Sequence, residues 1–186
     1  MDNFMPAIKV LGFTQKQTSI HMIKLIAFSL AFLTSMLFSS AIFADPLVYE
    51  GKSGPGKGKH IVFIASDHEY RGEETCPAIA RILAKRYGFK CTVLFGLDED
   101  GFIKPGSSKI PGMEALDKAD MMFLFLRFLH PDDATMKHFT DYLDRGGPVL
   151  GLRTTTHGFN GLKGKNSKYN YNSRDKSYDW GFGRQV

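Results

Sequence analysis

The sequence predicts an α/β protein, a parallel β-sheet with helices on both faces. Runs of apolar β-branched and aromatic residues, such as His60–Ala65 (HIVFIA), are typical of strands that are covered on both faces. Segments with apolar residues at helical spacing separate these runs, and this alternation implies right-handed crossovers between parallel strands. The 186 residues are 43% hydrophobic and 23% charged, which excludes a disordered or collagen-like chain.

The elements follow one another from His60 onward. The first and the last helix have recognisable boundaries: Gly88 ends the first, and Pro131 is expected in the first turn of the last, where it is well tolerated. Gly146 and Gly147 end that last helix. The expected strands are His60–Ala65, Phe89–Phe95, Met121–Leu126 and Pro148–Leu152. The expected helices are Thr75–Tyr87, Met113–Lys118 and Pro131–Arg145, with a long Gly/Pro loop at Gly96–Gly112. Such a sheet is flavodoxin-like or Rossmann-like.

Residues 1–44 are typical of a secretory signal peptide. Lys24 precedes the uncharged apolar run Leu25–Phe38, and the small residues 39–41 follow it. A positive region, an apolar region and a small-residue exit are the three parts of such a leader. The remainder of the chain is therefore expected to be exported, to the periplasm or the extracellular space.

Two features of the leader stay open. Cleavage fits after Ala44 and also after Ala41, and Met22 is an alternative start that would make residues 1–21 an over-extended one. An uncleaved anchor is the alternative to cleavage, because Leu25–Ala44 is long enough to span a bilayer.

The net charge of +5 lies at the two ends of the chain. Residues 1–44 hold three lysines against one aspartate, and residues 163–186 hold six basic residues against two acidic ones. Residues 45–162 hold 15 basic and 16 acidic residues, so the central body is almost neutral. This distribution does not favour a nucleic-acid partner.

Residues 45–59 are predicted to form a linker. Gly51–Lys59 (GKSGPGKGK) resembles a phosphate-binding loop, but Gly58 stands where that motif needs Ser or Thr. The segment also precedes a strand, whereas a phosphate loop follows one. We therefore interpret it as a tether.

Polar residues follow three of the expected strands, at the strand ends where α/β sheets bind ligands. Three histidines and two arginines are the candidates for acid/base work and for stabilising negative charge: His68, His130, His157, Arg127 and Arg153. The remaining candidates would bind substrate: Asp67, Glu69, Arg71, Thr154, Thr155 and Thr156.

Each candidate also has a structural explanation. Asp67 and Glu69 are possible caps of the next helix, the threonines are possible caps of the element after them, and His130 is a plain helix-start residue. Arg127 and Arg153 follow buried strands, where an unpaired charge is costly, so an internal ion pair with Asp67 or Glu69 is an alternative to a ligand. His60 and His138 are interpreted as structural. His68 and His157 lack a recognised metal-ligand spacing, so no metal site is predicted, and whether the protein uses a cofactor stays unknown.

Cys76 and Cys91 are expected to be free, mostly buried thiols. About ten helical residues at ~1.5 Å each separate them along the helix axis, which exceeds the ~7 Å limit between the Cα atoms of a disulfide. Cys76, near a helix N-terminus, is the one whose pKa could be lowered.

Four stretches together resemble the ThuA-like, or trehalose-utilisation, family. They are His60–Arg71 (HIVFIASDHEYR), 120–131, Gly146–Asn160 (GGPVLGLRTTTHGFN) and Tyr178–Val186 (YDWGFGRQV). That family is similar in fold to the class I glutamine amidotransferases, which have a flavodoxin-like sheet. The resemblance implies a role with a sugar derivative, such as trehalose or a keto sugar.

The sequence differs from the amidotransferases at the position of their nucleophilic cysteine. Their Gly-x-Cys-x-Gly elbow corresponds here to Gly151–Thr155, in which Arg153 replaces the cysteine and Thr155 the second glycine. A guanidinium cannot act as the nucleophile, so glutamine hydrolysis by this route is not expected. Whether the protein is an enzyme or a non-catalytic sugar-binding or structural module stays open at this stage.

The resemblance also adds Trp180 as a substrate-binding residue and implies an incomplete domain. Tyr70, Phe159 or Trp180 would stack on a sugar ring. Family members continue with further strands, so residues 60–186 would be a C-terminally truncated α/β domain, with Gly161–Asp179 as a long loop. A short protein with a disordered tail is the alternative, and the oligomeric state is not indicated.

Overall fold

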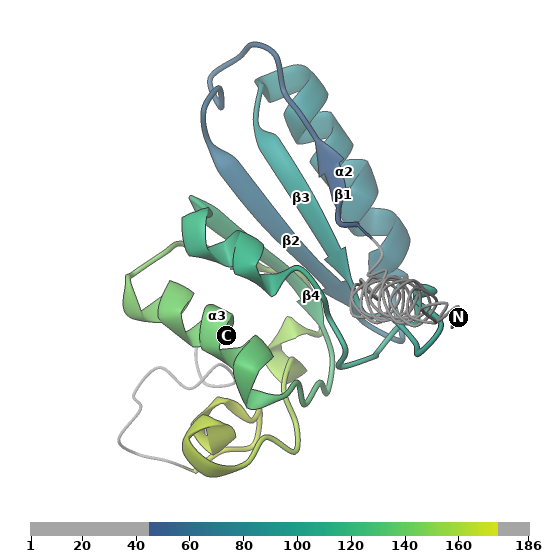
Figure 1. Cartoon of the computed structure of the whole chain (residues 1–186), viewed down its shortest axis with the longest axis vertical. Coiled ribbons are helices and arrows are strands. Elements are labelled where there is room, and N and C mark those ends of the chain that lie inside the picture. Colours follow the sequence, from purple (N-terminus) through teal and green to yellow (C-terminus); the bar gives the residue numbers. More distant parts are fainter. Residues whose placement is uncertain (1–44, 175–186) are drawn as a thin grey trace, which may run out of the picture. The chain divides into compact units, whose positions relative to one another are not determined.

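Five strands form one sheet in the order β1-β3-β2-β4-β5, in a computed structural model that describes residues 45–174 (Figure 1). The strands are β1 (Leu47–Tyr49), β2 (His60–Ser66), β3 (Lys90–Phe95), β4 (Met121–Leu126) and β5 (Val149–Gly151). The α-helices are α2 (Gly72–Tyr87) and α3 (Asp133–Asp144). Three 3₁₀-helices complete the described residues: η1 (Met113–Lys118), η2 (Thr155–His157) and η3 (Gly164–Tyr169).

The central strands are parallel, as the alternation of strands and helices predicts. Ile61 of β2 pairs with Cys91 of β3 on one side and with Met121 of β4 on the other. β5 continues the parallel pairing beside β4. The α/β class is thus confirmed.

β1 makes the sheet mixed, and the expectation of a wholly parallel sheet is wrong at this edge. β1 runs antiparallel to β3, with Val48 opposite Thr92. Three residues carry too little periodicity to stand out as a strand. The segment predicted as a linker, residues 45–59, therefore contains a strand of the sheet.

The rest of that segment packs against the turn between α2 and β3. The Gly51 N–H donates to the Phe89 carbonyl at 3.0 Å, and the Gly56 N–H donates to the Tyr87 carbonyl at 2.8 Å. A Cβ on Gly51 would lie 2.2 Å from the carbonyl carbon of Gly88. These glycines allow two backbones to approach closely, so the interpretation as a free tether is wrong.

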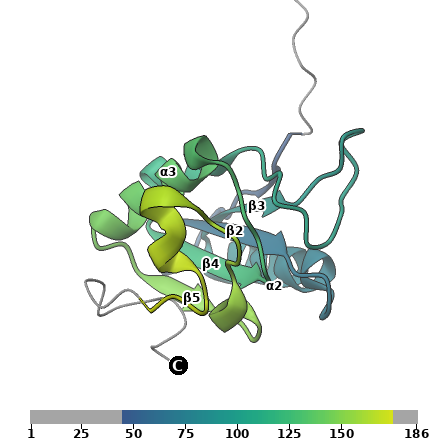
Figure 2. The ribbon, with the colours of Figure 1, turned by 90° about the horizontal axis from the view of Figure 1, so that it is seen from below.

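Helices cover both faces of the sheet, as predicted (Figure 2). Side chains of β2 alternate between the faces, so Phe63 packs on the α2 side and Ile64 on the α3 side. The α2 side contributes small residues: Cys76, Ala80 and Ala84. The α3 side is filled by larger ones: Met136, Phe139 and Tyr142, with Leu116 from η1.

Both α-helices begin at places that differ from the sequence prediction. α2 begins at Gly72, three residues earlier than expected, after Arg71 in a left-handed conformation (φ 53°). α3 begins at Asp133, and the Asp132 side chain caps it by accepting from the Thr135 N–H at 2.8 Å. Pro131 thus precedes the cap and does not lie in the first turn.

The segment predicted as a long loop, Gly161–Asp179, contains η3 in its described part. Tyr169 of η3 is buried, and its ring meets that of Phe139 edge-on at 6.0 Å between centroids. The Asn166 side chain donates to the Asp133 carboxylate at 2.8 Å. Buried aromatic and amide side chains hold this segment against α3. Its polar composition gives no sign of these contacts, which is why the sequence predicts a loop.

The predicted leader and Trp180 lie outside the described residues. Within residues 45–174, no helix combines the length and apolar character needed to cross a membrane.

Candidate functional site

Three loops meet at the carboxyl ends of β2, β4 and β5. The Phe128 N–H donates to the His157 carbonyl at 2.8 Å, which joins the second loop to the third. The Arg127 N–H donates to the Ser66 carbonyl at 3.4 Å, which joins the second to the end of β2. The loops that carry most of the predicted site residues are therefore neighbours in space.

Four aromatic rings gather where the loops meet, and we call His68, Phe128, His157 and Tyr171 the Phe128 cluster. The Phe128 ring centroid lies 6.3 Å from that of His68, 5.9 Å from His157 and 5.3 Å from Tyr171. The rings of His157 and Tyr171 are 5.2 Å apart. The three residues around Phe128 are exposed, so a ligand can reach both imidazoles from solvent.

Three non-glycine residues among those described have positive φ, and all lie in these loops: Arg71, Phe128 and Thr154. A positive φ is costly for a side chain with a Cβ, and for the β-branched Thr154, at 80°, it is especially unusual. Strained residues persist where surrounding contacts determine them, and they concentrate at functional sites. The backbone thus marks the same edge of the sheet as the side chains.

The guanidinium group of Arg127 lies over the ring of Phe128 and also pairs with a neighbouring carboxylate. It lies 4.8 Å from the Phe128 ring centre and forms an ion pair with Glu69. The side chains of Arg127 and Glu69 are 25% and 42% exposed, so both remain accessible from solvent. The ion pair that the sequence allowed as an alternative is therefore formed, by Glu69 and not by Asp67.

Arg153 does not need a buried partner. Its side chain is exposed, and its guanidinium lies 5.0 Å from the centre of the Tyr70 ring. Within residues 45–174 it forms no ion pair. The alternative of an internal ion pair is therefore wrong for Arg153, because β5 lies at the edge of the described sheet and is itself exposed.

Asp67 is buried, with 1% of its surface exposed. One carboxylate oxygen accepts from the backbone N–H groups of Glu69 and Tyr70, each at 2.7 Å. The other accepts from the Thr154 hydroxyl. Asp67 therefore holds two loops together, and it neither caps α2 nor opens to solvent as a substrate-binding group.

The three threonines after β5 differ in their accessibility. Thr154 is buried beside Asp67, and the Thr155 hydroxyl donates to the Leu124 carbonyl at 3.0 Å. Thr156 is half-buried, and its hydroxyl lies 2.9 Å from Nδ1 of His157. Thr154 and Thr155 thus bind the loop to the sheet, whereas Thr156 orients the imidazole of His157.

Two predicted site residues lie apart from the Phe128 cluster. His130 lines a different hollow of about 370 Å³ with Ser108 and Lys109, and its N–H bonds Ser108 Oγ at 2.9 Å. Arg71 is exposed and forms an ion pair with Glu74 in the first turn of α2. Neither residue is brought to the two histidines of the cluster.

The sequence reasoning missed Phe128 and Tyr171. Phe128 directly follows a predicted strand and stands between two predicted site residues, which is a signal that could have identified it. Tyr171 comes from beyond η3, and no local pattern connects it to the other loops. The packing of η3 against α3, together with the hydrogen bond from the Tyr171 N–H to the Phe159 carbonyl at 2.9 Å, brings that part of the chain near the site.

Both cysteines are free and buried, as predicted. Burial raises the pKa of Cys76 to about 12, with a further rise from the nearby Glu73 carboxylate, and burial raises the pKa of Cys91 to about 11. The suggestion that the helix N-terminus could lower the pKa of Cys76 is wrong, because burial and the Glu73 carboxylate both raise this pKa.

The arrangement offers two solvent-accessible imidazoles, a guanidinium and aromatic faces within one group of loops. Imidazoles exchange protons near neutral pH, and guanidinium groups bind oxygen atoms that carry negative charge. Within residues 45–174, no group of three or more His, Cys, Asp or Glu side chains is placed to hold a metal ion. No protein-family profile, no curated protein and no solved structure matches the chain.

Proposed function

We propose that the chain is an exported ThuA-like protein whose Phe128 cluster binds, or acts on, a sugar derivative. The observation that carries the proposal is the approach of His68 and His157 to the single ring of Phe128, with Arg127 above it. Both histidines come from stretches that resemble the family.

The order of the parallel strands supports the fold that the resemblance implies. In chain order, the first parallel strand (β2) lies between the second (β3) and the third (β4), and the fourth (β5) follows the third. This is the beginning of the flavodoxin-like order, in which ligands bind at the carboxyl ends of the strands. We therefore propose a flavodoxin-like, class I amidotransferase-like sheet.

The chemistry of the cluster suits a sugar ring. A pyranose has apolar C–H faces that pack on aromatic rings and hydroxyl groups at its edge that need hydrogen-bond partners. Phe128 and Tyr171 offer the rings, while the imidazoles and Arg127 offer the partners. His157 is the better candidate for acid/base work, because Thr156 holds its Nδ1 and leaves Nε2 for a ligand.

The turn after β5 gives no substitute for the amidotransferase cysteine. Its left-handed residue is Thr154, one position after Arg153, and the Thr154 hydroxyl is engaged by the buried Asp67. We therefore propose an activity, if the protein has one, that does not pass through a covalent intermediate at this turn.

A non-catalytic sugar-binding module is the second candidate. The carboxylates nearest the histidines are occupied, since Asp67 is buried in backbone hydrogen bonds and Glu69 pairs with Arg127. Among residues 45–174, no carboxylate is hydrogen-bonded to His68 or His157, and the imidazole–carboxylate contact of this part of the chain joins His138 and Asp117 instead. This arrangement favours recognition over proton transfer.

The test uses the full chain with trehalose and with 3-keto-glycosides. Calorimetry measures binding, and NMR of the sugar measures turnover. The His157→Ala and Phe128→Ala variants examine the cluster, and His130→Ala is the matched control because His130 lies outside it.

The outcomes separate the candidates. Turnover that His157→Ala abolishes and His130→Ala leaves unchanged supports an enzyme. Saturable binding without turnover, weakened by Phe128→Ala, supports a binding module. The absence of both binding and turnover of these sugars would contradict the proposal. The polar loops would then be structural ion pairs.

A further inference from the structure

A second hollow lies at the carboxyl end of β3, with a volume of about 410 Å³. α2, β3, the residues before β1 and the loop 96–112 enclose it. It shares no residue with the Phe128 cluster. Its wall is mainly apolar, including Pro46, Leu47, Pro77, Phe95, Leu97 and Ile103. The volume and the apolar wall are in the range of small-molecule sites.

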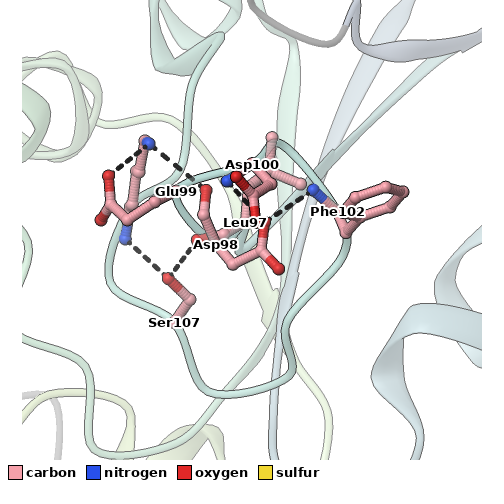
Figure 3. Close-up of polar contacts among 7 residues, drawn as sticks. Leu97, Asp98, Glu99, Asp100, Phe102 and Ser107 are labelled. Atoms are coloured by element: carbon pink, nitrogen blue, oxygen red, sulfur yellow. Dashed lines mark hydrogen bonds and ion pairs between the residues drawn. The ribbon is translucent and has the colours of Figure 1, made fainter.

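The loop over this hollow is held by its own hydrogen bonds (Figure 3). The Asp98 carboxylate accepts from the N–H groups of Asp100 and Phe102 at 3.0 and 2.8 Å. The Ser107 hydroxyl donates to the Leu97 carbonyl at 2.6 Å. These bonds close the loop across its base, so the rim formed by Gly101 and Ile103 is in place before any ligand arrives.

Glu73 brings an unsatisfied acceptor to this wall. Its Oε2 atom is enclosed by protein and has no hydrogen-bond partner within residues 45–174. The neighbouring cation, Arg71, pairs with Glu74 instead. A buried carboxylate oxygen without a donor is unfavourable, and native proteins usually satisfy such an atom with a protein group, an ordered water or a ligand.

The charged residues that line the hollow indicate which polar group a ligand would carry. Asp45 and Glu73 are its two ionisable residues, and no lysine, arginine or histidine lies among the lining residues. A carboxylate surrounded by apolar surface attracts a cation that can donate a hydrogen bond. An anion would meet only negative charge there.

We propose that this hollow binds a small organic cation, an ammonium group on an apolar body. The ammonium pairs with the Glu73 carboxylate, and the hydrocarbon part packs against Pro77, Phe95 and Ile103. The inference is independent of the proposed sugar site, because the two share no side chain.

The test uses three probes of equal length on the full chain: hexylammonium, hexan-1-ol and hexanoate. Calorimetry and saturation-transfer NMR measure their binding. We expect saturable binding of hexylammonium, weaker binding of hexan-1-ol and none of hexanoate. Equal binding of all three probes, or no saturable binding of hexylammonium, would overturn the proposal.

Two matched variants locate the binding. Glu73→Gln removes the charge and keeps the shape, so we expect hexylammonium affinity to fall by about tenfold to a hundredfold. Glu74→Gln alters the adjacent carboxylate, which lies outside the lining, and should leave the affinity unchanged. Equal losses in both variants would contradict a specific role of Glu73.

A third variant keeps the proposal testable if Glu73→Gln does not fold. Ile103 is 50% exposed at the rim, so Ile103→Trp should fill the mouth of the hollow without disturbing the core. We expect it to abolish hexylammonium binding while thermal unfolding stays as in the parent chain. Undiminished binding in this variant would place the ligand elsewhere and overturn the assignment.

Discussion

The Thr154 hydroxyl donates a hydrogen bond to the buried carboxylate of Asp67, which ties the loop after β5 to the loop after β2. His68 directly follows Asp67, and His157 lies three residues after Thr154. The bond therefore holds the two histidine-bearing loops at the spacing that lets both imidazoles face Phe128.

Thr154→Val should destabilise the fold by about 1–3 kcal/mol, because it leaves a buried carboxylate oxygen without its donor. Valine keeps the shape and the branching of threonine, so the backbone strain at this position is unchanged. Denaturant unfolding monitored by circular dichroism measures the loss.

Thr156→Val is the matched control for that experiment. Among residues 45–174, its hydroxyl is hydrogen-bonded to the neighbouring His157 alone, in a half-buried position, so little stability depends on it. A cost for Thr154→Val no larger than that for Thr156→Val would show that the Asp67 bond does not hold the loops.

The Glu69–Arg127 ion pair should contribute little to stability. Both side chains are partly exposed, and such pairs typically contribute about 0.2–1 kcal/mol. A double-mutant cycle with Glu69→Gln and Arg127→Gln measures the coupling. A coupling of several kcal/mol would favour the structural explanation of Arg127, whereas a small coupling with loss of ligand binding would favour a role in the site.

The α/β class could be predicted because the central strands carry unbroken apolar runs. Residues 121–126 (MMFLFL) form an unbroken apolar run of strand length, and β4 has the bounds that the sequence indicates. β1 could not be found in this way, because three residues show no period and their pairing depends on β3. The start of α2 could not be predicted because Arg71 adopts a left-handed conformation, and no sequence pattern indicates this.

The candidate site could be predicted only as a set of loops. The rule that ligands bind at strand carboxyl ends correctly groups His68 with His157, but it cannot give the direction of a side chain. His130 follows the same strand as Arg127, yet lies against Ser108 of another loop. Likewise, the burial of Asp67 follows from the Thr154 bond, which joins residues 87 positions apart.

The two cysteines should react slowly with thiol reagents in the native protein. The pKa of Cys76 is raised to about 12, so at pH 8 only ~10⁻⁴ of it is thiolate. We expect iodoacetamide to modify neither thiol until denaturant is added, as followed by mass spectrometry. Rapid native labelling of Cys76 but not of Cys91 would contradict the burial at the start of α2.

The same thiols make the fold sensitive to alkaline pH. Their folded pKa values, about 12 and about 11, lie above the ordinary value of 9.0, so the unfolded chain loses its protons first. Their contribution to stability is complete below pH 9 and is lost as the pH rises toward 11 and 12. A Cys76→Ala, Cys91→Ala variant should show a shallower decline of unfolding free energy above pH 9.

His60 should make the fold sensitive to mild acid. Burial lowers the pKa of His60 below 6.5, and Lys90 lowers it further, while Asp120 and Glu50 oppose the shift. The neutral ring bonds Thr92 Oγ1 at 2.8 Å. As the pH falls, His60 is therefore protonated in the unfolded chain before it is protonated in the folded one. Its contribution to the free energy of unfolding is complete above pH 6.5 and is lost as the pH drops below that value.

His60→Gln tests this effect between pH 7 and pH 5. The variant should retain a hydrogen bond to Thr92 and lose part of the decline in unfolding free energy. The lowered pKa values of Asp120 and Asp132 act in a more acidic range, below 3.8, so they do not mask the comparison. An unchanged slope in the variant would assign the acid sensitivity to other groups.

The apolar strand β5 should promote self-association of the chain. Val149 and Leu150 are each 39% exposed, and among residues 45–174 β5 pairs with β4 alone. Such an edge offers unpaired backbone groups and apolar side chains to another copy. Leu150→Lys should reduce association as the concentration rises, because a charge opposes edge-to-edge pairing. Ile82→Lys is the control, since Ile82 is 54% exposed on the helix α2 and has no strand edge beside it. Sedimentation velocity over a concentration series measures both, and an equal reduction by the two substitutions would assign association to net charge instead of to β5.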